Sequence, residues 1–541
     1  MREEYDALTA GAANHVPLSP LSFLKRAAEV YRSRPAVTYG TVTRDWAGFA
    51  ARCRSAAGGL GQLGIGYGDT VSVLAPNIPE LFELHFAVPL SGAVLNTINT
   101  RLEPETVAYI LRHSDSRLIL CDSALVPLLR TAFTLNGADL PVIEIADAVA
   151  GHAPTGIGSP YEELAQATPC EWSLPEHEGQ AIALNYTSGT SGRPKGVVYH
   201  HRGAWLMAMG TVTGWSLPQC PIYLSVVPMF HCNGWNHPWA MAAVGGHMIF
   251  TRDATPEKLI DAMQRHGVTH MGAAPIVLQM LCESTCAPAR AFDPKIRVMT
   301  AGAPPPPSVL ERATRLGLDV MQVYGLTETY GHISQCLWRE EWADLPAAEQ
   351  AAMQAMQGVA FPMVEGLRVV NPSTGQDVPD DGTTQGEIAI RGNTVMSGYY
   401  KDADATAEAF RDGWFWSGDA AVRHPNGYIQ IRDRLKDVII SGGENISSVE
   451  IEAALHRHPA VQIAAVVARP HARWGESPCA FVELRAGMTA TEAEIITFCR
   501  ERIAHFKAPK TVVFQPLPKT ATGKIQKFLL REAARTLGEQ T

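Results

Sequence analysis

The sequence predicts an α/β protein with a large N-terminal domain of two parallel-rich sheets, a β-rich subdomain, and a small mobile α+β domain at the C-terminus. Three observations support this. The chain has 541 residues, more than one folding unit usually holds. Strand-like and helix-like patterns alternate along most of it, which is typical of parallel sheets covered by helices. From about residue 386 the segments become shorter and richer in strands.

The first sheet is predicted from apolar runs that are followed by helical patterns. Residues 71–75 read as a strand, and the apolar positions from Leu81 to Leu90 after them follow a helical repeat. Residues 117–121 and 181–186 are further strands of the same kind. Several of these runs end in loops rich in glycine, proline or serine. Ligands sit at the carboxyl ends of strands in open parallel sheets, so we expect the chemistry in those loops.

The second sheet is predicted from a similar series. Residues 222–227 read as a strand, followed by the loop 228–234, an apolar helix and the strand 247–250. Three more strands are expected, at residues 268–271, 296–300 and 320–323. The N-terminal domain is predicted to cover residues 1–433, with its β-rich subdomain at about 360–433.

A domain boundary is predicted at residues 434–436, which we interpret as a hinge. Beyond it, residues 437–541 read as a compact mobile domain. Its predicted elements are a helix at 448–456, strands at 463–468 and 479–484, and a helix at 492–504.

Composition excludes several classes of protein. The net charge of −9 argues against binding nucleic acid through its phosphates. No apolar run approaches the roughly 18–20 residues that span a bilayer, so we expect no integral membrane association. The ten cysteines are irregularly spaced without a C-x-x-C pair, which favours reduced thiols over a zinc site or disulfides. The acidic start lacks the apolar segment of a secretory signal, and we expect a cytoplasmic protein.

The strongest local signal is the segment 186–196, directly after a predicted strand. It combines glycines that let backbone N–H groups approach an anion with several hydroxyls and Lys195. The spacing differs from the G-x-x-x-x-G-K-[ST] phosphate loop. A flexible surface loop is the alternative, but the composition favours phosphate binding.

Four further clusters follow in the sequence. The segment 323–329 offers the flat face of Tyr324, the hydroxyl of Thr327, and Glu328, a hard oxygen ligand suited to Mg²⁺ beside phosphates. Asp419 follows a glycine and can hold a sugar diol. The other two clusters are the segment 434–445 and the lysine-rich turn 518–527, for which a solvated basic loop is the alternative.

These five clusters, in this order, resemble those of the adenylate-forming enzymes, specifically the acyl-CoA synthetases. The resemblance covers essentially the whole chain. The segments 96–102, 228–235 and 440–447 are most similar to the short- to medium-chain ligases, among them 3-(methylthio)propionate–CoA ligases and plant acyl-activating enzymes. The resemblance implies that a small carboxylic acid, ATP and coenzyme A are the substrates, that Mg²⁺ assists, and that the enzyme is a homodimer.

The resemblance also implies roles for individual residues. For the phosphates of ATP it assigns Thr187, Ser188, Gly189, Thr190, Ser191, Lys195 and Thr327, and for the adenine Gly302, Ala303, Pro304 and Tyr324. It assigns Asp419 and Arg434 to the ribose, Glu328 to Mg²⁺, and Ser441, Gly442 and Gly443 to CoA. Lys524 would bridge the reacting carboxylate and the α-phosphate, Lys436 would serve as the hinge, and His231 would lie beside the carboxylate. His231, Trp235, Gly302 and Gly325 would line the acyl pocket.

Substrate size is predicted from three of these positions. In acetate-activating relatives a tryptophan occupies the position of Gly325, so glycine there implies room for more than two carbons. Trp235 and Trp239 add bulk at the expected pocket floor, although both could equally be core residues. Together they suggest an acid of about three to eight heavy atoms. His231 has a buried structural role as its alternative.

Four other functions remain open on the sequence. Two of them are a luciferase-like oxygenase that uses the same adenylate and a non-catalytic nucleotide-binding protein, which the presence of Glu328, Arg434 and Lys524 disfavours. An adenylation enzyme that loads a carrier protein would share the first half-reaction. A ligase for aromatic acids such as benzoate or cinnamate would share both.

Overall fold

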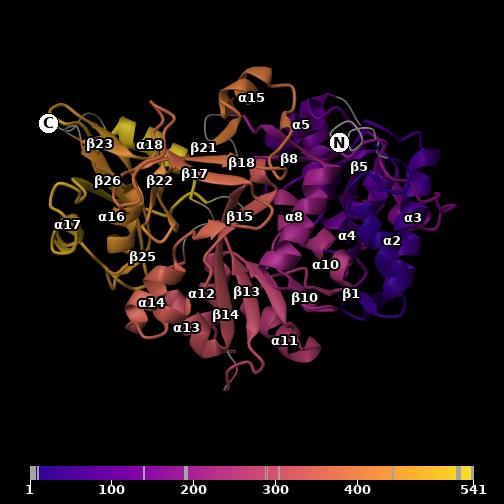
Figure 1. Cartoon of the computed structure of the whole chain (residues 1–541), viewed down its shortest axis with the longest axis horizontal. Helices are drawn as coiled ribbons and strands as arrows, with labels where there is room; N and C mark the ends of the chain where they lie inside the picture. Colours follow the sequence, from indigo (N-terminus) through magenta and orange to yellow (C-terminus); the bar gives the residue numbers. More distant parts are fainter. Residues whose placement is uncertain are drawn as a thin grey trace.

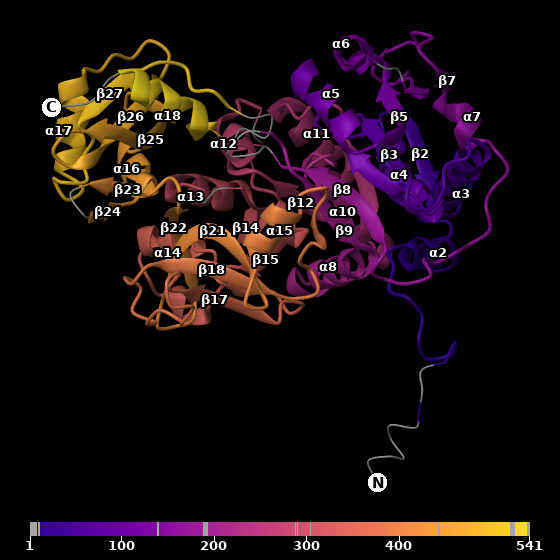
Figure 2. The ribbon, with the colours of Figure 1, turned by 90° about the horizontal axis from the view of Figure 1, so that it is seen from above.

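The computed structural model describes residues 8, 11–137, 140–187, 193–286, 288, 290–302, 305–441, 444–519 and 525–537. It confirms the predicted fold class. A large N-terminal part holds two sheets with many parallel strands, and a smaller α+β domain follows at the C-terminus. In Figure 2 the smaller domain, coloured gold, lies at the opposite end of the molecule from the indigo N-terminal segment.

The first sheet has eight strands in the order β19-β9-β8-β4-β3-β5-β6-β7. The pairs from β8 to β7 are parallel, while β9 and β19 are antiparallel to their neighbours. Its strands are β3 (Thr70–Leu74), β4 (Val94–Thr97), β5 (Ser116–Asp122), β6 (Val142–Ile145), β7 (Ser159–Pro160), β8 (Ala181–Tyr186), β9 (Gly196–His200) and β19 (Gly398–Tyr399). The helices in this part of the chain are α3 (Trp46–Gln62), α4 (Pro79–Leu90), α5 (Pro104–His113), η1 (Ser123–Leu125), α6 (Val126–Asn136) and α7 (Tyr161–Ala165).

The second sheet has nine strands in the order β16-β15-β14-β13-β12-β10-β11-β1-β2 (Figure 1). Its strands are β1 (Pro35–Tyr39), β2 (Val42–Asp45), β10 (Ile222–Ser225), β11 (His247–Phe250), β12 (His270–Ala273), β13 (Ile296–Thr300), β14 (Leu318–Leu326), β15 (Gly331–Gln335) and β16 (Val359–Ala360). The helices in this part of the chain are α2 (Leu21–Val30), α8 (His201–Gly214), α9 (Cys232–Trp235), α10 (His237–Val244), α11 (Pro256–His266), α12 (Pro275–Glu283), α13 (Pro307–Leu316), η2 (Thr327–Thr329), η3 (Glu340–Trp342) and α14 (Ala347–Gln354).

Helices between the two sheets join them through a common apolar core. Fully buried side chains of α3, α4 and α10 (Phe49, Phe82 and Trp239) belong to one cluster with Val73 of the first sheet and Met248 of the second. The two sheets are therefore parts of one folding unit, and the loops at the ends of their strands are held in fixed relation.

The β-rich subdomain is an antiparallel sheet in the order β17-β18-β21-β20, with β22 paired to β21. Its elements are β17 (Gly366–Val370), β18 (Gly386–Arg391), α15 (Ala403–Ala409), β20 (Phe410–Arg411), β21 (Trp414–Arg423) and β22 (Ile429–Arg434). Its last strand leads directly into the predicted hinge.

The C-terminal domain has its own sheet in the order β24-β23-β26-β25, with β27 parallel to β26, and its own apolar cores. Its elements are β23 (Ile439–Ser441), β24 (Glu444–Ile446), α16 (Ser448–Leu455), β25 (Val461–His471), β26 (Gly475–Leu484), α17 (Glu492–Arg500), β27 (Thr511–Phe514) and α18 (Lys527–Thr536). The start of α16 contacts β22: the backbone N–H of Ser448 donates to the carboxylate of Asp433 at 2.6 Å, and the Ser447 hydroxyl donates to the Arg432 carbonyl.

Several predicted elements have different ends in the structure. The strand expected at 268–271 is shifted to His270–Ala273, because Gly267 is left-handed and the Val268 N–H still caps helix α11 at the Met263 carbonyl. The helix expected to reach residue 504 ends at Arg500, where the N–H groups of Arg502 and Ile503 both turn back to the Cys499 carbonyl. Strand β1 was not predicted, since it joins β11 from more than 200 residues away.

Among the described residues, no helix is long and apolar enough to cross a bilayer. The longest helix with a strongly buried face, α3, carries arginines at positions 52 and 54.

Five histidines are almost completely buried in this fold: His85, His201, His237, His270 and His332. Burial disfavours the imidazolium and lowers the pKa of each, to about 4 in His85 and His270 and to about 3 in His201 and His332. Unfolded histidine has a pKa of about 6.5, so below that pH the unfolded chain binds protons that the native protein excludes.

We therefore expect the free energy of unfolding to fall as the pH drops below about 6.5, by about 2 kcal/mol per buried histidine at pH 5. Urea unfolding at pH 7, 6 and 5 measures it. His85→Leu should reduce the pH slope by about one proton, whereas the exposed His15→Gln should leave it unchanged. An identical slope in His85→Leu would contradict the interpretation.

Candidate functional site

The predicted phosphate loop connects β8 to β9. Its ends are pinned together, because the Thr187 N–H donates to the Lys195 carbonyl at 3.0 Å. Lys195 is half-buried and lies directly before β9. The predicted residues Ser188, Gly189, Thr190 and Ser191 lie outside the described residues.

Lys195 and Glu328 meet at the side chain of Tyr399. The Tyr399 hydroxyl donates to Glu328 Oε1 at 2.8 Å, and Lys195 Nζ lies 4.7 Å from the centre of the Tyr399 ring. Burial, and then the charge of Glu328, raise the pKa of Tyr399, so the phenol keeps its proton as the donor. Lys195 and Glu328, which come from different sequence clusters, thus contact the same side chain. The sequence had not indicated Tyr399 as a site residue.

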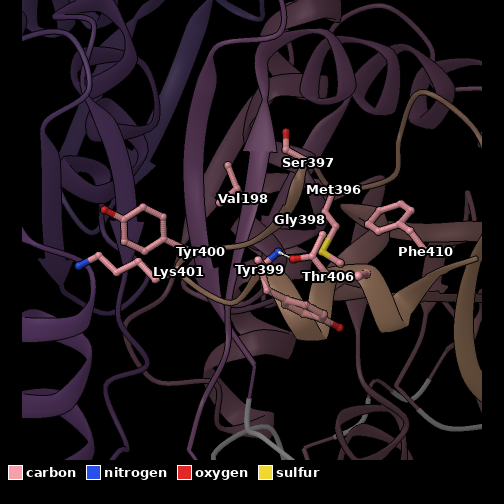
Figure 3. Close-up of a pocket in the computed structure, with 11 residues that line it drawn as sticks. Val198, Met396, Ser397, Gly398, Tyr399, Tyr400, Lys401, Thr406 and Phe410 are labelled. Carbon is pink, nitrogen blue, oxygen red and sulfur yellow. Dashed lines mark hydrogen bonds between the residues drawn. The ribbon is translucent and has the colours of Figure 1, made fainter.

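Tyr399 is held by β19, which pairs with β9 and places Tyr399 opposite Val197. An open cavity of about 710 Å³ lies beside it, with apolar walls from Val198, Met396 and Phe410 (Figure 3). The Thr406 hydroxyl accepts a hydrogen bond from the Tyr399 N–H at 3.0 Å. Backbone and side chain of Tyr399 therefore both have fixed partners.

Tyr324, Asp419 and Arg434 form a second group. The Tyr324 hydroxyl donates to Asp419 Oδ2 at 2.5 Å, and Arg434 Nε lies 2.7 Å from Asp419 Oδ1. Asp419 is only 3% exposed, and it pairs with Arg434 across the β21–β22 ladder. A carboxylate accepts about four hydrogen bonds, so both oxygens still have capacity for a diol.

The segment after β10 forms a left-handed turn that carries the predicted residue Trp235 and follows directly on His231. Residues 232–236 all have positive φ, from 42° to 64°. Only glycine and asparagine adopt this region readily, and Cys232 and Trp235 together cost about 2–4 kcal/mol. Two amides hold the turn: Asn185 Nδ2 donates to Asn233 Oδ1 at 2.5 Å, and the Asn236 side chain donates to the Tyr330 carbonyl.

This turn places His231 and Trp235 on either side of Cys232, whose sulfur lies 3.4 Å from Thr327 Oγ1. Burial raises the pKa of the Cys232 thiol to about 12, which excludes a thiolate nucleophile near neutral pH. His231, half-exposed, lies at the start of the turn, and its N–H donates to the Pro228 carbonyl at 2.9 Å. Trp235 is 7% exposed.

Packing and backbone conformation are sufficient to explain the presence of Gly325, Gly302 and Trp239 at their positions. A Cβ on Gly325 would lie 1.6 Å from the Gly331 carbonyl oxygen, so packing of β15 against β14 alone explains this glycine. A Cβ on Gly302 would meet no described atom within 4 Å, and its φ of 98° itself favours glycine. Trp239 is fully buried and donates to the His85 carbonyl at 3.1 Å, which makes it a core residue.

The remaining predicted residues lie either near the domain boundary or outside the residues that the structure describes. Lys436 is exposed, and Ser441 ends β23. Asp433, directly before the predicted hinge, accepts a hydrogen bond from the Ser448 N–H of the C-terminal domain, and Asp437, directly after the hinge, pairs with Arg531 within that domain. Ala303, Pro304, Gly442, Gly443 and Lys524 lie outside the described residues.

These groups can hold a nucleotide and a magnesium ion. The hydrogen bond from Tyr399 occupies Oε1 of Glu328, and no cluster of three or more metal-ligating side chains occurs among the described residues. One carboxylate together with substrate phosphates and water is a common way to bind Mg²⁺. Tyr324 and the Asp419–Arg434 pair, with Lys195, add partners for base, ribose and phosphate.

Comparison with known families decides what this site belongs to. Residues 24–400 match the AMP-binding enzyme family, and residues 450–524 match the AMP-binding enzyme C-terminal domain. The chain belongs to the AMP-binding enzyme family. Within it, this protein is an adenylate-forming acyl-CoA synthetase, an acid–thiol ligase that releases AMP.

Curated relatives match over nearly the whole length of this synthetase. A 2-methylpropanoate–CoA ligase of Humulus lupulus is 47% identical over 98% of this chain and 97% of its own. An acetate/butyrate–CoA ligase of Arabidopsis thaliana, described as peroxisomal, is 45% identical over 99% and 98%. A trans-cinnamate:CoA ligase of Petunia hybrida, also described as peroxisomal, is 43% identical over 98% and 97%.

Solved structures share the fold. ATP-bound MatB from Rhodopseudomonas palustris superposes with a TM-score of 0.83 at 26% identity, over 96% of this chain and 99% of that one. The o-succinylbenzoate CoA synthetase of Bacillus subtilis with its acyl-adenylate gives 0.81 at 26% identity, over 94% and 97%. As a member of this family, the synthetase uses ATP, Mg²⁺ and coenzyme A.

Gly325 allows a test of what that position does. We expect Gly325→Ala to separate β15 from β14, to lower the stability by about 3 kcal/mol, and to reduce activity with all acids alike. Urea unfolding and kcat/KM for acetate and hexanoate measure both effects. Gly61→Ala in helix α3, where a Cβ meets nothing within 4 Å, is the control. A stable Gly325→Ala enzyme that merely prefers acetate would restore the pocket interpretation.

Proposed function

We propose that this synthetase activates short- to medium-chain aliphatic acids, converting acid, ATP and CoA into acyl-CoA, AMP and pyrophosphate through an acyl-adenylate. The observation that carries the proposal is the position of Trp235 on the strained turn next to His231, which puts a bulky apolar wall beside the predicted carboxylate site. Relatives that are named for 2-methylpropanoate and for acetate and butyrate support the size range. The acid 3-(methylthio)propionate falls in the same range.

In the adenylation step, a carboxylate attacks the α-phosphorus, and two anions must come together. Fixed positive charge and positioning are therefore the main catalytic tools. We assign Lys195 and Thr187 to the phosphates, with Thr327 at the α-phosphate and Lys524 between it and the carboxylate. Mg²⁺ at Glu328 supplies further charge neutralisation when bound. The acid is already ionised at neutral pH, so this step needs no general base.

The remaining assignments concern the nucleotide and the acid. Tyr324 faces the adenine, and Asp419 with Arg434 holds the ribose. Gly302, Ala303 and Pro304 form the wall between the adenine and the acyl group. His231 lies beside the reacting carboxylate.

In the thioester step, the CoA thiol must reach the acyl carbon of the adenylate, and Lys524 would block its access in the adenylation step. We propose that the domain after residue 437 turns about Lys436 and exchanges Lys524 for the pantetheine-binding segment Ser441, Gly442 and Gly443. The seam supports this motion. Hydrogen bonds cross it from the Ser448 N–H to Asp433 and from the Ser447 hydroxyl to the Arg432 carbonyl, and these can break singly, while the ion pair of Asp437 with Arg531 lies within the turning domain.

An aromatic acid is the second candidate, favoured by the 43% identity to a trans-cinnamate:CoA ligase. We also propose a cytoplasmic homodimer, on the strength of the family resemblance and of the sequence composition. Sedimentation of the purified enzyme tests the oligomeric state.

An acid panel tests the activity. AMP and thioester are followed together with propionate, 3-(methylthio)propionate, butyrate, 2-methylpropanoate, hexanoate, octanoate, benzoate and cinnamate. We expect the highest kcat/KM for an aliphatic acid of three to six carbons, falling about 10-fold or more for octanoate and cinnamate. Lys524→Ala should abolish adenylate formation. Highest activity with cinnamate would select the second candidate, and adenylate without thioester would indicate a carrier-loading enzyme.

Tyr399 should tune the affinity for Mg²⁺ and ATP. We expect Tyr399→Phe, which removes the hydrogen bond to Glu328 but keeps the ring, to raise the Mg²⁺ concentration for half-maximal ATP binding about 10-fold. Tyr399→Leu should in addition weaken ATP binding in EDTA about 3-fold, since Lys195 loses its aromatic neighbour.

Calorimetric titration of ATP with and without Mg²⁺ measures both effects. Tyr400→Phe is the matched control, because the Tyr400 hydroxyl bonds to Asp115 and not to Glu328. An unchanged Mg²⁺ dependence in Tyr399→Phe would show that the hydrogen bond does not orient the metal ligand.

A further inference from the structure

Two buried histidines, His237 and His332, lie next to the predicted acyl pocket without any assigned role. They are 1% and 2% exposed, and their ring centres are 6.2 Å apart. His237 follows the left-handed turn, and its ring lies 6.0 Å from that of Trp235. His332 on β15 is the register partner of Gly325. The pair therefore adjoins the predicted acyl pocket from two sides.

The hydrogen bonds of His237 fix its tautomer. Tyr223 OH lies 2.6 Å from His237 Nδ1 and already accepts a hydrogen bond from the Gly272 N–H. Among the described residues the hydroxyl proton of Tyr223 has no other acceptor than Nδ1, and we infer that it goes there, which leaves the ring proton on Nε2. His237 Nε2 is buried and has no partner among the described residues. His237 therefore presents an unused donor.

His332 has the opposite pattern. The Thr211 hydroxyl donates its single proton to the Met207 carbonyl at 2.9 Å, so His332 Nε2, 3.0 Å from that oxygen, must be the donor of its own bond. The unprotonated Nδ1 of His332 is buried and also lacks a partner in the described part of the chain. His332 therefore presents an unused acceptor, and burial keeps both rings neutral.

A buried donor and a buried acceptor left unpaired are costly, and one group can satisfy both. The nitrogens lie about 1 Å from their ring centres and hydrogen bonds are about 2.8–3.0 Å long, so one oxygen can reach both rings at a centre separation of 6.2 Å. The group must accept one hydrogen bond and donate one, and it must be uncharged, because no described cation or anion pairs with either ring.

We propose that His237 and His332 form a two-point binding site for a hydroxyl group, which accepts from His237 Nε2–H and donates to His332 Nδ1. The hydroxyl comes either from a hydroxy-substituted short-chain acid, an assignment that rests on the proposed function, or from a structural water. Ser334 and Gln335, two and three residues after His332 on β15, also carry buried oxygens without described partners, so unsatisfied polar capacity is concentrated on this strand.

Matched acids distinguish the two sources. Each pair has the same number of heavy atoms and differs by a hydroxyl in place of a methyl group: 3-hydroxypropionate with butyrate, 4-hydroxybutyrate with pentanoate, and 5-hydroxypentanoate with hexanoate. If the acid supplies the hydroxyl, His332→Leu should lower the ratio of kcat/KM for hydroxy over alkyl acid about 10-fold or more at one of these lengths. His332→Gln, which keeps an acceptor, should retain most of the ratio.

The control is His85→Leu, another buried histidine with one unpartnered nitrogen, which should leave all three ratios unchanged. If a water supplies the hydroxyl, the ratios stay constant, and a high-resolution crystal structure of the wild-type enzyme shows one water within hydrogen-bond distance of both nitrogens. Constant ratios together with no density between the rings would overturn the proposal. The crystallographic arm uses the wild type alone, so it stands if a variant fails to fold or if no acid of the panel is activated.

Discussion

The backbone contact between Gly325 and Gly331 organises this site. Strand β14 pairs in parallel with β13 along its first half, and then in an antiparallel manner with β15. The change of direction brings the two strands so close that residue 325 tolerates no side chain, since a Cβ there would lie 1.6 Å from the Gly331 carbonyl oxygen. The turn that results presents Thr327 and Glu328 at the carboxyl end of a parallel sheet, where ligands bind in such folds.

Around this turn, charged groups are fixed before any substrate arrives. Glu328 is oriented by Tyr399, and Asp419 by Tyr324 and Arg434. Each partner comes from another element, so the positions of the polar groups depend on the packing of both N-terminal sheets and of the β-rich subdomain. Preorganisation of this kind lowers the reorganisation needed when charge moves during phosphoryl transfer.

Local patterns in the sequence predicted much of the fold and the outline of the site. Residues 181–186, 247–250 and 296–300 form strands with the expected ends, because each is an apolar run between clear turn signals. The structure brings Lys195 and Glu328 to the same tyrosine and pairs Asp419 with Arg434, in keeping with the roles that the family resemblance implied. Tyr399 was missed, since its partner Glu328 lies 71 residues away and no local pattern encodes that contact.

Other features could not be read from sequence for different reasons. The proposed joint role of His237 and His332 depends on which ring nitrogen of each is already hydrogen-bonded. Contacts with Tyr223 and Thr211, which are distant in the sequence, decide this. The sequence interpretation of Gly325 compared side-chain volumes only, whereas the structure fills the same space with backbone. Strand β1 depends on a partner distant in the chain.

Under the proposed function, in which Trp235 lines the acyl pocket, the left-handed turn at residues 232–236 limits how this protein can acquire new substrates. Asn233 and Asn236 are tied by their amides, and Gly234 by its backbone, so these three positions tolerate little exchange. Substitution is therefore confined to the other side chains of the turn, above all Trp235. Selection for a different acid would thus change the side chain at position 235 while the backbone of the turn stays the same.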